Sequence, residues 1–376
     1  MKNKIGKFTR LLLVIPLILA FLAASPVLAE EEQEPGTTAQ EADSGFLMFA
    51  AAASATALQP VITATGYIYL SLDGLGVGDN TPGTIQVDKP AGATVRAAYL
   101  IASDVWGSNG GPLPDGAITL NGNPVQWSIQ VQGGPNHAWA DVTSIVKPIV
   151  DAAPAGLVNI TVVETIYLDG SILAVIFDDP GQTDVNTVIL LFGAQQSTGD
   201  TFNVLLADPV DLSNPNLGME LSLGISFGYQ DYGSQYSEVD VNGTRLTSFA
   251  GGEDDGFGGN GGLITVGGIG DSIANPPDPY GTSYDYRYDD ELYNILPFVS
   301  DGDTSIVIDT LNPSQDDSIH FAALFIQSAI AIIGEGIVLT PAAATNVIST
   351  NHTVTATVQD DDGNPVSGKE VTFNIT

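Results

Sequence analysis

Short runs of β-branched and aromatic residues, separated by turn residues, recur along most of the chain and constrain its fold. The runs begin near residue 61 and are rich in Val, Ile, Thr and Tyr. Gly, Pro, Asn and Asp lie between them, and the 376 residues include 42 Gly and 22 Pro. This spacing is typical of antiparallel β-sandwiches. The sequence therefore predicts an all-β fold with one short helix over Val142–Ala152, which Pro148 limits in length.

Three pairs of segments resemble one another in the same order along the chain. The pairs are Ile118–Val125 with Val239–Leu246, Asn159–Thr165 with Thr304–Thr310, and Asp169–Ile172 with Asp317–Ile319. The first pair contains Asn-Gly turns at Asn121 and Asn242, a strong signal for β-hairpins. The shared order favours two related β-sandwich units, residues 61–195 and 196–333, and one large domain that contains both is the alternative.

The N-terminus has the order of a secretory signal peptide. Four Lys or Arg residues lie before an apolar run over Leu11–Ala24, and small residues precede Glu30. We expect cleavage between Ala29 and Glu30, so residues 1–29 are the predicted signal peptide. The apolar run is shorter than the roughly 20 residues that a membrane helix needs, and an uncleaved anchor is the alternative. The signal predicts an extracellular or cell-surface location, with no membrane span beyond it.

The expected mature chain is strongly acidic. The whole sequence has 10 Lys and Arg and 44 Asp and Glu, a formal charge of −34. Removal of the signal takes away four basic residues and no acidic ones, which leaves a charge of −38. Such a chain repels phosphate backbones, which argues against nucleic acid as a partner. There is no cysteine, so stability outside the cell must come from burial and not from disulfides.

Residues 30–60 are expected to be an acidic and Ala-rich linker. Its second half, Phe46–Leu58, fits either a short helix or a loosely ordered segment. The region after it has patchy features of the sandwich modules of large prokaryotic surface proteins. The residues that carry this resemblance are Arg96–Leu100, Ile118–Gly122, Ala140–Thr143 and Ile172–Pro180. The resemblance implies a surface location and no particular activity.

The C-terminal segment, residues 338–376, has a more specific pattern. Two alternating stretches, Thr353–Val358 and Val371–Phe373, flank an Asp-Gly-Asn-Pro-Val turn at residues 362–366, followed by Gly368. This segment resembles the opening of a bacterial immunoglobulin-like domain of group 1, the invasin and intimin type. The resemblance implies a stalk or spacer module. Since a complete sandwich of this type has about 100 residues, we expect further sequence after Thr376.

Two acidic segments are candidate cation sites. A Gly-rich stretch contains Glu253, Asp254 and Asp255, and a second segment contains Asp285, Asp289 and Asp290, followed by Glu291. Carboxylates supply the oxygen ligands, about six to eight of them, that Ca²⁺ prefers. The sequence thus predicts that no cofactor is required, with Ca²⁺ as the candidate ion. A solvated acidic loop without metal is the alternative.

Tyrosines crowd the second acidic segment at Tyr280, Tyr284, Tyr286 and Tyr288. Tyrosine combines an apolar ring with a hydroxyl, so clustered tyrosines can stack on sugars or contact a protein. This segment is the predicted binding surface for an unknown protein or glycan outside the cell. Packing of the rings beneath their own loop is the alternative.

The sequence lacks the common catalytic patterns. It has three histidines but no HExxH motif, no Gly-x-Ser-x-Gly elbow, no P-loop and no cysteine nucleophile. We therefore predict a non-enzymatic extracellular or cell-surface protein, structural or adhesive, that presents β-sandwich modules on an Ig-like stalk. A carbohydrate-binding module of an exported polysaccharide system is the first alternative. An exported hydrolase that uses a pair of carboxylates is the second.

Overall fold

The computed structural model describes fifteen stretches of the chain. These are residues 46–48, 57–76, 81–104, 111–132, 135–196, 198–226, 237–251, 264–275, 291–313, 318–334, 336–340, 351, 353–359, 366–369 and 371. Residues 44–376 form one compact unit, to which all of the described residues belong. The predicted signal peptide and its cleavage site, Ala29 and Glu30, lie outside the described residues.

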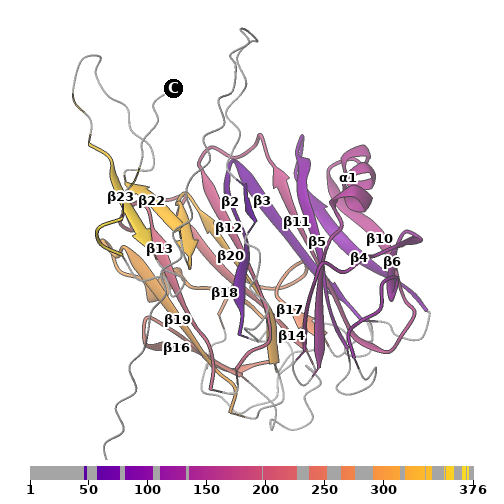
Figure 1. Ribbon diagram of the computed structural model, residues 1–376. Helices are drawn as coiled ribbons and strands as arrows, with labels where there is room; N and C mark the ends of the chain where they lie inside the picture. Colours follow the sequence, from indigo (N-terminus) through magenta and orange to yellow (C-terminus); the bar gives the residue numbers. More distant parts are fainter. Residues whose placement is uncertain are drawn as a thin grey trace, which may run out of the picture. The chain divides into compact units, whose positions relative to one another are not determined.

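The unit is nearly all β, as the sequence predicts, and its larger sheets stack in four layers (Figure 1). The first outer sheet has the order β4 (Pro82–Lys89), β10 (Gly156–Glu164), β6 (Ile118–Leu120), β7 (Asn123–Pro124). The first inner sheet has the order β3 (Ile68–Leu75), β11 (Leu168–Asp178), β5 (Thr94–Asp104), β9 (Asn136–Asp141), β8 (Ile129–Gln132).

The other two layers are built from later strands. The second inner sheet has the order β1 (Phe46–Met48), β2 (Gln59–Gly66), β12 (Asn186–Phe192), β20 (Ser318–Gln327), β14 (Gly218–Ser226), β17 (Ile264–Val266), and β18 (Leu292–Asn294) also pairs with β14. The second outer sheet has the order β16 (Thr244–Ala250), β15 (Ser237–Val241), β19 (Ser305–Leu311), β13 (Thr201–Leu206), β21 (Ala331–Ile333). A separate pair consists of β22 (Gly336–Thr340) and β23 (Thr355–Gln359).

Three apolar cores fill the spaces between the four layers. In β11, Ile172, Ala174 and Ile176 contribute to the core between the two inner sheets. The alternate residues Leu173 and Val175 contribute to the core between the first inner and first outer sheets. Successive side chains of a strand point to opposite faces, so an inner strand is buried on both sides. This explains why an inner strand such as β11 has a continuous apolar run instead of alternation.

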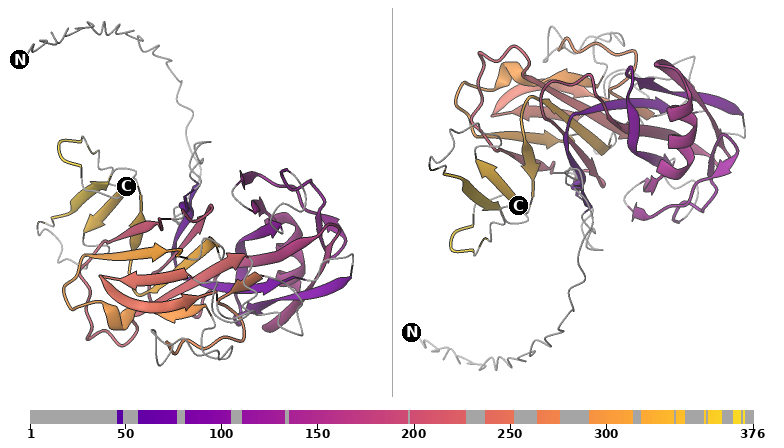
Figure 2. Two further views of the ribbon diagram at one scale, coloured as in Figure 1. Left: turned by 90° about the horizontal axis from the view of Figure 1, so that it is seen from below. Right: turned by 90° about the horizontal axis from the view of Figure 1, so that it is seen from above.

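The two sandwiches, which lie side by side in Figure 2, have the same strand order. We call residues 68–178 the first repeat and residues 186–327 the second repeat. In each repeat, the chain runs from the inner sheet to the outer sheet, back to the inner sheet, and then into a hairpin of the outer sheet. These elements are β3, β4, β5 and β6–β7 in the first repeat, and β12, β13, β14 and β15–β16 in the second. The last two strands then return to the outer and inner sheets, at β10 and β11 in the first repeat and at β19 and β20 in the second. The boundaries 61–195 and 196–333 stay predictions.

The Asn-Gly turns show the same hydrogen bonds in both repeats. The Asn121 N–H donates to the Thr161 carbonyl (2.8 Å), and the Thr161 N–H donates to Asn121 Oδ1 (2.7 Å). Asn242 and Val307 make the same two bonds, at 2.8 and 2.9 Å. Thr161 thus corresponds to Val307, whereas the alignment of the two sequence segments matched it with Ile306. The difference matters because a slip of one residue exchanges the two faces of a strand.

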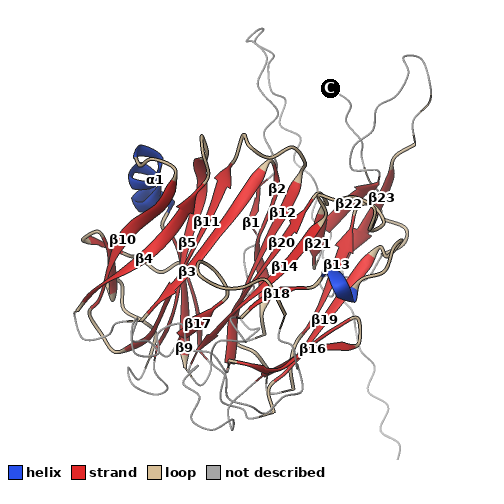
Figure 3. Ribbon diagram, turned by 180° about the vertical axis from the view of Figure 1, so that it is seen from behind, coloured by secondary structure: helices blue, strands red, loops and turns tan. Residues whose placement is uncertain are grey.

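Helix α1 (Thr143–Ala152) confirms the expected helix, and Pro148 lies within it. It packs against β5 and buries Val146 and Val150 (Figure 3). A 3₁₀ turn, η1 (Leu296–Phe298), occupies the corresponding place in the second repeat. No helix among the described residues is long and apolar enough to cross a membrane.

One local expectation differs from the structure, and one apolar run of the sequence is divided between two sheets. Phe46–Met48 form strand β1, paired with β2, and not the start of a helix. The apolar run Phe321–Ile333 is divided between β20 and β21. Ser328 has a φ of 57° at this division, and its N–H donates to Asn186 Oδ1 at 3.0 Å. The turn moves the chain from the second inner sheet to the second outer sheet.

Candidate functional site

The predicted cation and binding residues lie outside the described residues. They are Glu253, Asp254, Asp255, Asp285, Asp289 and Asp290 for the cation, and Tyr280, Tyr284, Tyr286 and Tyr288 for the ligand. These residues belong to two segments, 252–263 and 276–290, and the structure describes the chain directly before and directly after each segment. Within the described part of the chain, no group of three or more His, Cys, Asp or Glu side chains could hold a metal ion.

A buried carboxylate joins the ends of these two segments. Gly251 comes directly before the first segment, and Glu291 comes directly after the second. Glu291 is fully buried, and its Oε1 accepts a hydrogen bond from the Gly251 N–H at 2.5 Å. Its Oε2 accepts one from the Tyr293 hydroxyl at 3.1 Å. The last residue of the second acidic cluster therefore holds the base of the two segments together.

The same base is fixed by close backbone packing. A Cβ on Gly267 would lie 2.2 Å from the Glu291 carbonyl oxygen, so only glycine fits there. The Asn275 side chain donates to the Asn294 carbonyl and accepts from the Asn294 N–H, both at 2.8 Å. Asn275 precedes the second segment and Asn294 lies just beyond its end, so this pair closes the segment at its root.

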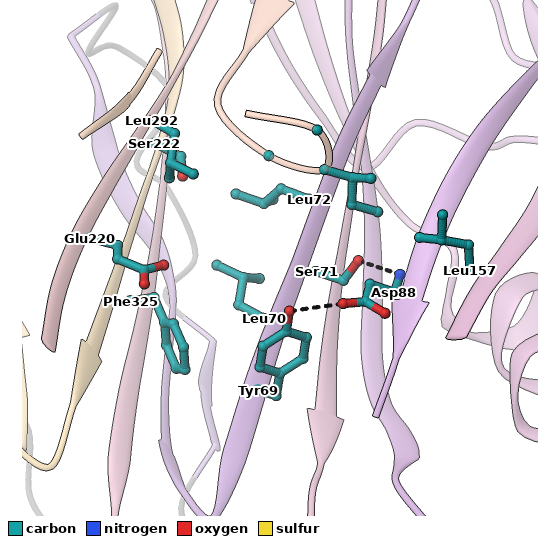
Figure 4. A pocket seen from close by; sticks show the side chains of 13 residues that line it. Tyr69, Leu70, Ser71, Leu72, Asp88, Leu157, Glu220, Ser222, Leu292 and Phe325 are labelled. Carbon is teal, nitrogen blue, oxygen red and sulfur yellow. Dashed lines mark hydrogen bonds between the residues drawn. The ribbon is translucent and has the colours of Figure 1, made fainter. Parts of the chain in front are cut away.

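A groove of about 270 Å³ lies next to this base, between the two repeats (Figure 4). Strands β3, β4 and β10 of the first repeat form one side of the groove, and strands β14, β18 and β20 of the second form the other. Its lining residues are Tyr69, Leu70, Ser71, Leu72, Asp88, Leu157, Glu220, Ser222, Gly268, Ile269, Gly270, Leu292 and Phe325. The groove thus combines leucine side chains, two aromatic rings and two carboxylates.

The polar groups of the first repeat form a short chain of hydrogen bonds along the groove. The Tyr69 hydroxyl donates to Asp88 Oδ2 at 3.2 Å, and the Asp88 N–H donates to Ser71 Oγ at 2.9 Å. The Tyr69 ring meets Phe325 edge to face, with 6.0 Å between centroids. Burial, and then the charges of Asp88 and Glu220, raise the pKa of Tyr69 to about 12. Tyr69 therefore stays protonated and holds Asp88 as its acceptor.

Glu220 is the second carboxylate of the groove. It is partly buried on β14, and burial raises its pKa. No described residue donates a hydrogen bond to it, and its carboxylate faces the groove (Figure 4). No Lys or Arg is found among the described residues that line the groove. A desolvated carboxylate without a donor is unfavourable, and a ligand that supplies one would stabilise it.

The repeat explains why a groove exists at this place. The Val142 N–H donates to the Ala98 carbonyl, and the Ile295 N–H donates to the Met219 carbonyl, both at 2.9 Å. The turns that follow are also alike: the Asp141 and Asn294 side chains each accept the backbone N–H two residues on, at 2.9 and 3.0 Å. Strand β5 with β9 in the first repeat therefore corresponds to β14 with β18 in the second.

The corresponding residues differ in size and polarity. In the register of these strand pairs, Tyr99, Ile101 and Trp139 of the first repeat match Glu220, Ser222 and Leu292 of the second. The three residues of the first repeat are at most 2% exposed and belong to the core between the inner sheets. Tyr99, Ile101 and Trp139 fill the interface in the first repeat. The smaller or charged residues at the corresponding positions of the second repeat do not fill it, and the groove results.

The sequence contains a signal for the groove that the search for motifs does not use. The strand Gly218–Ser226 places Met219, Leu221 and Leu223 on one face, with Glu220 and Ser222 on the other. Inner strands β11 and β12 are apolar on both faces, whereas β14 has one polar face, which marks the side of the inner sheet that is incompletely covered.

A second pocket, of about 410 Å³, involves Tyr67 of the β2–β3 turn, Asp184, and residues that flank β13 and β20. Its Asp184 carboxylate already accepts a hydrogen bond from Asn216 Nδ2 at 2.8 Å and one from the Thr183 hydroxyl at 3.0 Å. The carboxylate with no donor from the described residues is in the groove, which makes the groove the stronger candidate. Comparison of the chain with protein-family models, with curated proteins and with solved structures finds no match in any of the three.

Proposed function

We propose that this is a non-enzymatic extracellular or cell-surface protein, structural or adhesive, whose β-sandwich repeats form a rigid head. The observation that carries the proposal is the packing of both repeats through one shared core, beside which Glu291 and Asn275 hold the roots of two long segments. Binding residues on loops positioned by a rigid scaffold are the usual arrangement in β-sandwich proteins. The predicted signal peptide, the acidic charge and the resemblance of residues 338–376 to an Ig-like domain support the location.

The location is tested on the producing cell. Antibodies against residues 61–333 should label intact cells, or the protein should accumulate in the medium, and protease added outside should remove it. Full protection from external protease until the cells are lysed would contradict the proposal. A cytoplasmic marker protein, protected in both cases, is the control for cell integrity.

The predicted Ca²⁺ site is tested separately, because its residues lie outside the described chain. If Glu253–Asp255 or Asp285–Asp290 bind the ion, millimolar Ca²⁺ should raise the melting temperature of residues 30–376. Mg²⁺ at the same concentration is the control for ionic strength. No shift with Ca²⁺ would remove the ion from the proposal and leave the acidic segments as solvated loops.

A glycan ligand is the first alternative, and Tyr69 and Phe325 in the groove favour it because aromatic rings stack on sugars. A glycan array should then show reproducible binding to defined sugars. Binding that is lost in Tyr284→Ala or Tyr288→Ala would place the sugar on the second segment. Binding that survives both and is lost in Tyr69→Ala would place it in the groove.

An exported hydrolase is the second alternative, and the specific observation in its favour is the pair Asp88 and Glu220 in one groove. A glycosidase uses one carboxyl with a raised pKa as the acid and a second, ionised carboxylate. Glu220 has a raised pKa, whereas Asp88 already accepts a hydrogen bond from Tyr69. Release of reducing sugar from a panel of polysaccharides, abolished in Glu220→Gln, would establish the hydrolase.

A further inference from the structure

We propose that the groove between the two repeats binds a single cationic side chain, Lys or Arg, of a partner polypeptide. This deepens the proposed function by naming the chemistry of the partner. The groove is lined by Asp88 and Glu220, and no described Lys or Arg lines it. Of the two carboxylates, Asp88 has Tyr69 as a donor and Glu220 has none among the described residues. A cation is the ligand that completes this site.

The apolar walls fit the stem of such a side chain. Lys and Arg bury their methylene groups along apolar surface and keep the charged end with polar partners. Leu70, Leu72, Leu157 and Leu292 line the groove together with the carboxylates. The Tyr69 and Phe325 rings also line the groove, and aromatic rings attract cations. The stem can therefore lie between the leucines while its charged end reaches Glu220.

The size of the groove favours one side chain over a larger ligand. Pockets for drug-sized molecules have volumes of about 300–1,000 Å³, and the groove is just below this range, at about 270 Å³. It lies open at the meeting of two repeats, where a chain of a second protein could pass. The net charge of −34 would also accelerate the approach of a basic partner.

The test uses n-butylammonium as the probe, because it carries one charge on an aliphatic stem. Residues 30–376 with labelled leucine methyl groups are titrated and followed by NMR. We expect saturable shifts at Leu70, Leu72, Leu157 and Leu292, and none at Leu206 and Leu217 of the second pocket. The neutral 1-butanol should give no saturable shift. Equal binding of the alcohol, or shifts spread evenly over the leucines, would overturn the proposal.

Matched variants separate the groove from the overall charge. Glu220→Gln should weaken butylammonium binding at least about fivefold, because a charge-assisted hydrogen bond is replaced by a neutral one. Asp184→Asn removes the same charge from the second pocket and should leave binding unchanged. Equal weakening in both variants would mean that the probe senses net charge only, which contradicts the proposal.

A variant at the exposed rim of the groove tests binding without disturbing the fold. Leu157 lines the groove and is 58% exposed, so Leu157→Lys should leave stability unchanged and place an ammonium of the chain's own at the groove. Binding of the probe should fall at least about fivefold, since a second cation then meets a like charge. Undiminished binding in Leu157→Lys would overturn the proposal. These measurements use purified protein, so their outcome does not depend on whether the protein is located at the cell surface.

Discussion

The interface between the two inner sheets has a closed side, which side chains fill, and an open side, which contains the groove. The two sides are built from corresponding strands of the two repeats. On the closed side Tyr99 lies against Trp139, with 5.0 Å between ring centroids, and Trp139 against Phe192 at 5.7 Å. On the open side the positions of Tyr99 and Trp139 are Glu220 and Leu292, and a groove remains. The backbone is kept, and three substitutions change a filled core into a candidate binding surface.

A fold with two repeats can bind a ligand where one repeat leaves the shared interface unfilled. The closed side supplies stability for both repeats, because its residues belong to the core they share. The open side can then carry a partly buried carboxylate, whose cost the rest of the interface offsets.

Exchange of the corresponding residues Tyr99 and Glu220 should have very unequal effects. Tyr99→Glu buries a carboxylate without a cation and should lower the free energy of unfolding by about 3–5 kcal/mol. Glu220→Tyr places a ring in an open groove and should change it by less than about 1 kcal/mol. Urea denaturation of both variants measures the difference. Equal losses would mean that the two sides are not different in packing.

Acid should act on the closed side through two buried histidines. His137 and His320 stack at 4.8 Å between centroids. Burial lowers the pKa of His320 to about 3, and burial together with the neighbouring His320 lowers the pKa of His137. Below pH ~6.5 the unfolded chain binds protons that the folded one does not. Stability is therefore complete above about pH 7 and falls as the pH drops below ~6.5, by about 2 kcal/mol from His320 at pH 5 and by a further amount from His137.

Comparison with a variant isolates this contribution. Asp73 has a pKa raised to about 6 by burial, so it gains protons on folding and stabilises the fold as the pH drops below that value. The double variant His137→Phe/His320→Phe keeps Asp73 and removes only the histidines. We expect its urea midpoint to fall less than that of the wild type between pH 7 and pH 5. The same fall in both proteins would contradict the prediction.

The two Asn-Gly turns should respond alike, because they are equivalent in the repeats. Asn121 and Asn242 have φ angles of 47° and 50°, and each accepts a backbone hydrogen bond from a neighbouring strand. Asn121→Ala and Asn242→Ala should each cost about 1–2 kcal/mol, from the lost bond and the unfavourable φ. The corresponding changes to Gly should cost less, since glycine accepts the turn geometry. A large effect in one repeat alone would break the equivalence.

The smallest expected effect is on the open side. Tyr69→Phe removes the hydroxyl that donates to Asp88 and keeps the ring against Phe325. Because the groove lets water replace the lost donor, the melting temperature should fall by an amount that corresponds to less than about 1 kcal/mol. Tyr293→Phe, which removes a donor to the fully buried Glu291, is the matched comparison and should cost more.

The sequence predicts the strands and the repeat more fully than the site. Asn-Gly pairs and alternating runs are local signals, so the hairpins at Asn121 and Asn242 and the helix near Pro148 are confirmed. The pairing of inner sheets is not local: whether Tyr99 or Glu220 faces a filled or an open interface depends on strands far away in the chain. The segments with the most visible composition, around Asp254 and Tyr284, lie outside the described residues, while the groove depends on Glu220 and Asp88, which no motif marks.

The most direct test of the groove as the binding surface is to refill it with the residues of the closed side. The triple variant Glu220→Tyr/Ser222→Ile/Leu292→Trp copies Tyr99, Ile101 and Trp139 onto the corresponding positions. NMR titration with butylammonium, read at the Leu70 and Leu72 methyl groups, should show saturable shifts in the wild type and none in the variant. The variant should unfold at the same urea concentration as the wild type or a higher one. Retained binding in a folded triple variant would show that the groove is not the site.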